Sequence, residues 1–276
     1  MKRFGKRNRL TVAVLTFNQE QYVAQALDSV MNQAVSIPFD LLIHDDASTD
    51  TTQHEIRTWL KINKRSVPNS KVILRRENLR EQGLNTRPAV LKPIRTEFVA
   101  WCDGDDYWTD RNKLEKQVNF MDQNLWCSVC HHDVVLEIEG RVPGDDPHLL
   151  STKTLLAMEN RKIERQAGPR LVAQNTVVAS SVMLRRSSVR DSALDAMKNI
   201  YSTDWLISCV AMEDGDLGFL SDNMSAYRMR RNSAWQGRPK ALYEEAHRKC
   251  LAWLSTHAQG EIQREARVQL LKLDGS

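Results

Sequence analysis

The sequence FVAWCDGDDYW, residues 98–108, joins an apolar run to three carboxylates and two aromatic side chains. The carboxylates are Asp103, Asp105 and Asp106. Like charges this close repel, so a folded chain holds them beside a cation or in a solvated acidic turn. The apolar run predicts a buried strand, which places the carboxylates just beyond its carboxyl end.

Strands and helices alternate on both sides of this stretch. Short apolar, β-branched runs indicate strands, and apolar residues at helical spacing indicate helices between them. Alternation of this kind predicts an α/β fold, with a mostly parallel sheet covered by helices on both faces. In the first half we expect strands at residues 11–16, 39–45, 70–76, 96–103 and 126–138, and helices at 19–33, 48–62 and 112–124.

The second half is less regular. We expect a strand at 176–186, a helix at 201–213, a return strand at 218–231 and a tail of one or two helices at 242–273. Two finer expectations concern helix ends: Ser48 or Thr49 is a plausible N-cap, and Leu125 closes an apolar stripe. In the tail, Leu242 begins another stripe, which predicts packing against the body or against a second copy of the chain.

Polar clusters follow several of the predicted strands. They are Thr16-Phe17-Asn18, Asp45-Asp46 and the aspartates of residues 103–106. Parallel sheets bind ligands outside the carboxyl ends of their strands, so we expect these clusters to meet on one edge and form a site.

Composition bounds the classes of function. The chain has 276 residues, 41% apolar and 27% charged, with a formal net charge of +4. This charge is too small to indicate a nucleic-acid binder, and the basic start has no apolar segment behind it that would make a secretory signal. No stretch approaches the ~18 apolar residues of a membrane span. The five scattered cysteines favour reduced thiols in a cytoplasmic protein; a zinc site at Cys127-x-x-Cys130 would need a second ligand pair.

The three aspartates suit a divalent cation, because Mg²⁺ and Mn²⁺ prefer hard oxygen ligands and complete their shell with phosphate and water. The glycine-rich phosphate loops of dinucleotide-binding and P-loop proteins are both absent from the sequence. A phosphate bound here would therefore be neutralised by a metal together with arginine or lysine.

Three segments resemble the signature segments of family 2 glycosyltransferases. They are VAVLTFNQEQYVAQALDSVMNQ, FDLLIHDDASTDTT and EFVAWCDGDDYWTDRNKLEKQVNF, and the likeness continues through residues 202–235. The resemblance implies the GT-A fold and an inverting enzyme that uses a nucleotide sugar. It divides the chain into a nucleotide-sugar-binding half (1–130) and an acceptor and catalytic-base half (131–238). A shift in composition near residue 239 sets off a helical tail (239–276).

The resemblance also implies roles for individual residues. Asp105 would bind Mn²⁺ or Mg²⁺ at the diphosphate, and Asp204 would be the catalytic base. Asp46 would hydrogen-bond the nucleotide base, and Asp103 the ribose or sugar. Asp106 would be a supporting metal ligand or a sugar contact. Further nucleotide contacts would come from Thr16, Phe17, Asn18 and Arg87.

The chemistry of inversion fits these roles. One carboxylate deprotonates the acceptor while it attacks the face of the sugar opposite the leaving group. The departing nucleoside diphosphate needs positive charge rather than a proton. For Asp204 the alternative is a carboxylate favoured by the dipole at a helix start. Its neighbour Trp205 either walls the acceptor site or belongs to the core.

One position departs from the family pattern Tyr-Arg-x-His. In YRMRRNSAW, Arg230 stands where the histidine is expected. Arginine cannot ligate a metal, but it can pair with a phosphate through two parallel hydrogen bonds. We therefore expect Arg230 to supply charge to the leaving group, with Arg228 or Arg231 as helpers; a solvated basic loop is the alternative. The missing Gln-x-x-Arg-Trp signature favours transfer of a single sugar over polymerisation.

The expected partners are a UDP-, dTDP- or GDP-sugar and a glycan or lipid-linked acceptor. The basic start and the helical tail are compatible with contact at the inner face of a membrane, and the tail with a homo-oligomer. Two other functions stay open. One is a non-catalytic nucleotide or glycan binder, and the other is a metal-dependent phosphohydrolase with Asp103 as nucleophile.

Overall fold

The apolar runs of the sequence form the strands of one sheet in the structure, a computed structural model that describes residues 8–63, 69–138, 165–200, 202–230 and 240–274. Four strands of the first half lie parallel, in the order β3-β2-β1-β4. Their carboxyl ends therefore meet on one edge. The strands are β1 (Leu10–Thr16), β2 (Phe39–Asp45), β3 (Ser70–Leu74) and β4 (Phe98–Asp103).

The second half extends the sheet beyond β4. There β8 pairs antiparallel with both β4 and β6, while β6 and β9 run parallel to each other. It follows that β9 points in the same direction as β4 and ends at the same edge. Two short strands, β5 and β7, pair antiparallel with β9. The bounds are β5 (Tyr107–Trp108), β6 (Cys127–Ile138), β7 (Arg165–Gln166), β8 (Met183–Arg185) and β9 (Asp216–Met229).

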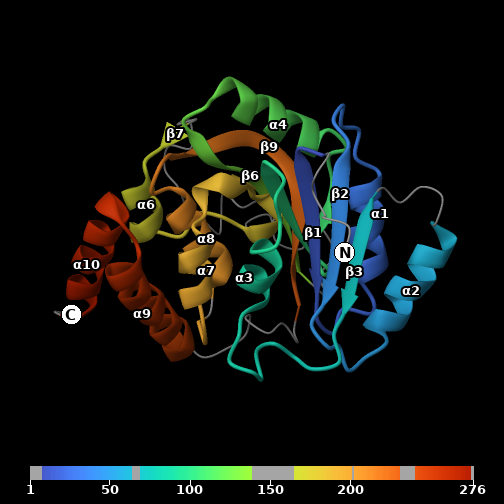
Figure 1. The fold of residues 1–276 in the computed structure, drawn as a ribbon, viewed down its shortest axis with the longest axis horizontal. Coiled ribbons are helices and arrows are strands. Elements are labelled where there is room, and N and C mark those ends of the chain that lie inside the picture. The colour runs from blue at the N-terminus through green and yellow to red at the C-terminus, as the bar shows by residue number, and fades with distance from the viewer. Residues whose placement is uncertain (1–7, 64–68, 139–164, 201, 231–239, 275–276) are drawn as a thin grey trace.

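Helices cover both faces of the sheet (Figure 1). Alternate residues of β1 show why: Val12 and Val14 pack in one buried cluster with the first group of helices, while Ala13 and Leu15 pack in another with the second. The first group is α1 (Val23–Met31), α2 (Thr52–Ile62) and α4 (Lys113–Gln123). The second is α3 (Thr86–Leu91), α6 (Gly168–Ala173), α7 (Asp191–Ala196) and α8 (Thr203–Ala211). The predicted α/β architecture is confirmed.

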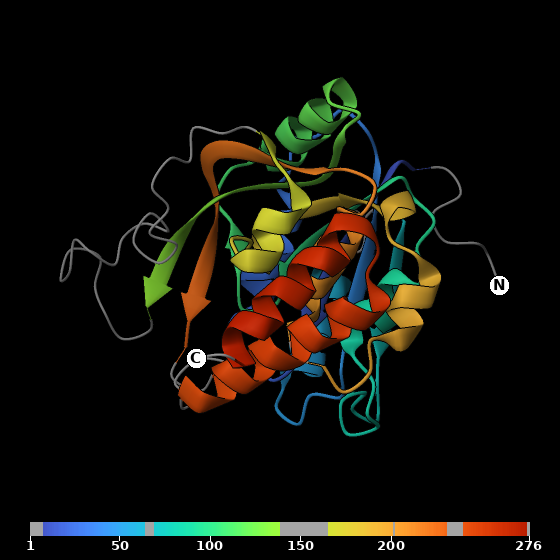
Figure 2. The ribbon, with the colours of Figure 1, turned by 90° about the vertical axis from the view of Figure 1, so that its left-hand side faces the viewer.

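The tail forms two helices, α9 (Lys240–His257) and α10 (Gly260–Asp274), which lie side by side against the body in Figure 2. Cys250, Trp253 and Ile262 belong to the same buried cluster as Trp101 of β4. The apolar stripe of the tail therefore packs on the body, the first of its two expected partners. Leu242, expected on that stripe, is 42% exposed. Among the described residues, no helix combines the length and apolar character needed to cross a bilayer.

The strand expected at residues 176–186 is much shorter in the structure. Only Met183–Arg185 pairs in the sheet, and Ala179–Ser181 forms a 3₁₀ turn. The Ser181 hydroxyl donates to the carbonyl of Val178 at 2.7 Å. Serine offers the backbone such local bonds in place of a sheet ladder, which explains the interruption.

Two expectations at helix ends are wrong. Ser48 and Thr49 do not cap α2, which begins at Thr52 after an N-cap at Thr51. Leu125 lies beyond the end of α4 and is 82% exposed, because that helix stops at Gln123. The polar residues before α2 and the apolar residue after α4 both extend the sequence pattern beyond the residues that make helical hydrogen bonds.

Candidate active site at the carboxyl edge of the sheet

The ends of β1, β2 and β4 lie next to one another. Thr16 pairs with Asp45 and Leu15 with Asp103 in the parallel ladders. Beyond the ladders, the amide of Asp46 donates to the carbonyl of Thr16 at 3.0 Å. The polar clusters predicted after these strands therefore share one edge, as expected.

Asp45 ties the loops after β1 and β2 together. Its buried carboxylate accepts from the Thr16 hydroxyl at 2.9 Å and from the Ser48 amide at 3.0 Å. The Asn18 amide donates to the Ser48 hydroxyl at 2.9 Å, and Asn18 Oδ1 accepts from the Thr49 amide at 2.8 Å. The two residues expected to cap α2 thus fix this loop pair instead.

The two remaining positions after β1 differ in exposure. Phe17 is 42% exposed, so its ring is free to meet a ligand at this edge. Asn18 has a φ of 52°, a left-handed conformation that asparagine tolerates better than most residues. Its carbonyl accepts from Arg230 Nη1 at 3.3 Å. Asn18 thereby connects the loop after β1 to the end of β9.

Asp46 is 5% exposed and both of its carboxylate oxygens are occupied by the chain. Oδ1 accepts from the Leu79 amide and Oδ2 from the Thr86 hydroxyl, each at 2.9 Å. Arg75 Nε lies 3.8 Å from Oδ1. Because a carboxylate has about four lone-pair positions, it keeps capacity for one more donor. The contact between Asp46 and a nucleotide base stays a prediction.

Asp103 is held by Arg87, the second residue of α3. Arg87 Nη2 lies 2.7 Å from both carboxylate oxygens, and the side chains are 14% and 26% exposed for Arg87 and Asp103. Burial raises the pKa of Asp103; Arg87 opposes this, while the charges of Asp105 and Asp204 add to it. Burial would lower the pKa of Arg87, but Asp103 and Asp204 raise it overall.

Asp105 is held from the other side by β9. Arg230 Nη2 lies 2.7 Å from Asp105 Oδ2, and Arg228 Nη1 donates to the Asp105 carbonyl at 3.0 Å. Arg228 also donates to Gln25 Oε1 at 2.6 Å and is 8% exposed. Arg228 and Arg230 are therefore built into the site rather than part of a solvated basic loop. Arg231 lies outside the described residues.

Asp106 points into the protein. It is 1% exposed, and its Oδ1 accepts from the Arg228 amide at 3.0 Å. Burial, together with the charges of Asp105 and Asp103, raises its pKa well above the ordinary value. A role as a metal ligand or sugar contact stays a prediction, and the contact present in the structure joins this loop to β9.

Asp204 lies in the first turn of α8, on the same edge. It follows Ser202, whose left-handed φ of 53° turns the chain into the helix. The side chain is partly exposed, and its charge is close enough to raise the pKa of both Asp103 and Arg87. Trp205 beside it is 2% exposed and donates to the Leu171 carbonyl at 2.9 Å, so this tryptophan belongs to the core.

The sequence did not identify the residues that set the position of the aspartate loop. At Gly104, an added Cβ would lie 2.5 Å from Gln19 Oε1 and 2.6 Å from Thr16 Cγ2. Lys113 of α4 is fully buried, donates to Gln117 Oε1 at 2.7 Å and lies 4.1 Å from the centre of the Trp108 ring. Two features of the sequence could have indicated these residues: a glycine between two aspartates, and a lysine at a core-facing position of α4.

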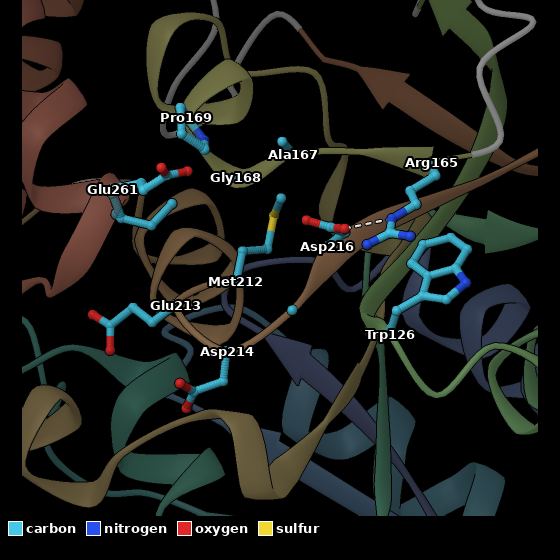
Figure 3. Close-up of a pocket in the computed structure, with 12 residues that line it drawn as sticks. Trp126, Arg165, Ala167, Gly168, Pro169, Met212, Glu213, Asp214, Asp216 and Glu261 are labelled. Atoms are coloured by element: carbon cyan, nitrogen blue, oxygen red, sulfur yellow. Dashed lines mark hydrogen bonds and ion pairs between the residues drawn. The ribbon is translucent and has the colours of Figure 1, made fainter.

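A pocket of about 330 Å³ lies at the opposite edge, where β6 and β9 begin (Figure 3). Arg165 lies between Trp126 and Asp216 there, with its Nε 2.5 Å from the carboxylate of Asp216. None of the predicted site residues lines this pocket. It is therefore separate from the candidate active site.

Comparisons with known proteins agree with this architecture. Residues 11–192 match the sequence profile of Glycosyl transferase family 2. A relative is the uncharacterized protein Rv1520 of Mycobacterium tuberculosis (strain ATCC 25618 / H37Rv), 30% identical over 227 residues, which are 82% of this chain and 60% of the relative. The chain thus spans 60% of that relative's length.

A second relative is poly(ribitol-phosphate) beta-N-acetylglucosaminyltransferase TarS of Staphylococcus aureus (strain Mu50 / ATCC 700699). It is 28% identical over 172 residues, 58% of this chain and 28% of TarS. The crystal structure of S. aureus TarS 1–349 in complex with UDP-GlcNAc matches with a TM-score of 0.68 at 20% identity, over 96% of this chain and 71% of that one.

The fold is shared more widely. Mannosyltransferase PcManGT from Pyrobaculum calidifontis, in complex with GDP-Man and Mn²⁺, matches with a TM-score of 0.55 at 17% identity, over 98% of this chain and 76% of that one. Together with the sheet order and the helical layers, these matches confirm the GT-A glycosyltransferase fold expected from the sequence. The chain belongs to Glycosyl transferase family 2.

Proposed function

We propose that this chain transfers a single sugar, with inversion, from a nucleoside diphosphate sugar to a glycan or lipid-linked acceptor. The observation that carries the proposal is the grouping of Asp103, Arg87 and Asp204 on the ligand edge of the sheet, where the charge of Asp204 raises the pKa of both Asp103 and Arg87. Asp103 and Arg87 could serve a protein that only binds a nucleotide. The carboxylate of Asp204 is needed only if the acceptor must lose a proton.

Asp204 acts as the base in this proposal. It is partly exposed at the start of α8, so a hydroxyl of the acceptor can reach it. The carboxylate takes the proton of that hydroxyl as its oxygen attacks the anomeric carbon, and the nucleoside diphosphate leaves from the opposite face. Asp103, held by Arg87 on the donor side, orients the ribose or the sugar.

The donor lies over the loops after β1 and β2. Phe17 offers an exposed ring to the base, and Asp46 a carboxylate with spare acceptor capacity. Thr16 and Asn18 shape the floor of the pocket through the bonds they make to Asp45, Ser48 and Thr49. UDP-GlcNAc and GDP-Man are the donors named for the structural neighbours, which supports a UDP-, dTDP- or GDP-sugar here.

A divalent metal at Asp105 does not fit the residues as they stand. The Asp105 carboxylate is paired with Arg230 and that of Asp103 with Arg87. We therefore assign no step of the reaction to a metal, although one neighbour of the same fold is a complex with Mn²⁺.

The acceptor side is formed by the second half of the chain, and part of it lies outside the described residues. TarS is named for poly(ribitol-phosphate), which supports a polymer as the acceptor class. Such an acceptor would be met in the cytoplasm at the inner membrane face. The basic residues 1–7, which would favour that location, also lie outside the described residues.

The test is a panel of UDP-, dTDP- and GDP-sugars incubated with the purified chain, with and without candidate acceptors. A transferase releases the nucleoside diphosphate slowly alone and faster with its acceptor, and the product has the inverted anomeric configuration by NMR. Release of inorganic phosphate would favour the phosphohydrolase instead. Binding of a donor without any release would favour the non-catalytic binder.

A further inference from the structure

Arg230 is held at the site by three contacts. Nη2 lies 2.7 Å from Asp105 Oδ2, Nη1 donates to the Asn18 carbonyl at 3.3 Å, and the guanidinium lies 5.3 Å from the centre of the Tyr22 ring. The side chains of Arg230 and Asp105 are 12% and 17% exposed. The cation therefore occupies a defined place between the loop after β1 and the aspartate loop.

Two arginines at this edge retain unused hydrogen-bond donors. Within the described residues, the Nε atoms of Arg87 and Arg230 are buried and have no hydrogen-bond partner. A buried N–H without a partner is costly, so such atoms mark places where a ligand or a small movement supplies an acceptor. Phosphate oxygens match the fork of a guanidinium, which can bind two of them at once.

From these observations we infer that Arg230 is the built-in counter-charge for the donor's diphosphate, and that it and a divalent cation exclude each other at Asp105. The inference rests on the proposed function, because it presumes a nucleoside diphosphate at this edge. Arginine stays protonated at every physiological pH and has no lone pair for a metal. A cation brought to Asp105 would have to displace this guanidinium and then lie beside its positive charge.

The inference predicts which binding events need a metal. Arg230 would keep Nη2 on Asp105 and offer its unpaired Nε to a phosphate oxygen when the diphosphate binds, and Arg87 would do the same beside Asp103. Binding would then proceed in a chelator. Arg230→His would restore the residue of the family pattern and free Asp105, so binding by that variant would depend on Mn²⁺.

The experiment is calorimetric titration of the full chain with UDP, with dTDP and with GDP, in EDTA and in Mn²⁺. Binding of Mn²⁺ to the chain without nucleotide is followed separately by electron paramagnetic resonance. The variants are Arg230→Ala, Arg230→His and Arg230→Lys. Arg264→Ala is the matched control, because it removes an exposed arginine of α10 that pairs with exposed Glu261 at 3.3 Å, away from the site.

We expect wild type to bind one of the three nucleotides in EDTA about as tightly as in Mn²⁺. Arg230→Ala should weaken binding in EDTA at least about tenfold, the usual loss for a charge-assisted pair. Arg230→Lys should lie between the two, Arg230→His should bind well only in Mn²⁺, and Arg264→Ala should match wild type. Both Arg230→Ala and Arg230→His should bind Mn²⁺ more tightly than wild type in the resonance experiment.

Two results would overturn the inference. One is a wild type that binds nucleotide only in Mn²⁺, which leaves the proposed function intact. The other is an Arg230→Ala variant that binds like wild type in EDTA. Nucleotide binding in EDTA without any sugar transfer would keep the inference and count against the proposed function. No binding of UDP, dTDP or GDP under any condition would contradict both the inference and the proposed function.

Discussion

Arg87 on α3 and Asp103 at the end of β4 form a two-point contact, with Nη2 2.7 Å from each carboxylate oxygen. The preceding residue of α3, Thr86, donates to Asp46 at the end of β2. The first turn of one short helix thus connects two strand ends of the candidate site. A change in α3 is therefore expected to affect the donor pocket at two places at once.

Replacing Arg87 with alanine should weaken nucleoside diphosphate binding by at least about tenfold and destabilise the fold by about 1–3 kcal/mol, because Asp103 then stays partly buried beside Asp105 and Asp204 without its cation. Arg87→Lys keeps the positive charge but not the planar guanidinium, so it should retain part of the affinity and part of the stability. Calorimetry and urea unfolding provide the two measurements. If Arg87→Ala binds the nucleoside diphosphate as tightly as wild type, Arg87 does not contact the donor.

Asp204→Asn should lower kcat by about 10²–10⁴, the usual contribution of a general base, while donor affinity stays near that of wild type. The amide keeps the shape of the side chain but cannot take the acceptor's proton. The measurement is initial rate against acceptor concentration, with donor affinity determined separately. Asp195→Asn, an exposed carboxylate of α7, is the matched control. Equal losses in both variants would contradict the role of Asp204.

Lys113 should make stability rise with pH above neutrality. Burial lowers its pKa to about 7, whereas in an unfolded chain it titrates near 10.5. Between these values the unfolded chain binds more protons, so the free energy of unfolding increases with pH by up to about 1.4 kcal/mol per unit. Below pH 7 both states are protonated, and the full cost of burying the charge is present.

Lys113→Met should remove this slope, which urea unfolding at pH 6, 7 and 8 would measure. The comparison is the difference between the two proteins, because other groups titrate in both. Buried thiols such as Cys102, whose pKa burial raises, act in the opposite direction at higher pH. Parallel stability curves for wild type and Lys113→Met would show that the buried lysine stays charged in the folded chain over this pH range, which would contradict the prediction.

Gly104→Ala should displace the aspartate loop and weaken donor binding, since its Cβ would lie 2.6 Å from Thr16 Cγ2 and 3.3 Å from the Leu15 carbonyl. Overpacking of this kind costs about 1–3 kcal/mol. Gly260→Ala separates stability from binding: it has open space for a Cβ but a φ of +57°. That variant should lose about 1 kcal/mol of stability and keep its donor affinity. Thermal unfolding and calorimetry on both variants distinguish the two effects.

The sequence predicted which strand ends meet at the candidate site, but not which side chains pair with one another there. Apolar runs locate β1, β2 and β4, and parallel pairing then brings Thr16, Asp46 and Asp103 to one edge. Which cation meets which aspartate depends on pairings far apart in the chain. Arg230 lies near Asp105 because β5, which follows the aspartate loop, pairs with β9 at Tyr107 and Ala226, and periodicity does not encode that pairing.

Local signals also failed where side chains bond across loops. Ser48 and Thr49 are residue types that often cap helices. Here the Ser48 hydroxyl accepts from the Asn18 amide, and the Thr49 amide donates to Asn18 Oδ1. The serines near residue 180 interrupt a run that otherwise resembles a strand. In each case a tertiary or turn contact outweighed a weak local preference.

The buried cluster shared by α8, α9 and α10 determines whether the chain can be truncated before its helical tail. Leu251 and Leu254 of α9 are fully buried in the same cluster as Leu206 of α8, the helix that carries Asp204. The shift in composition near residue 239 resembles a domain boundary, yet the apolar face beneath it is continuous. A version of the chain that ends there would expose that face to water, and its failure to transfer sugar would report on folding rather than on catalysis.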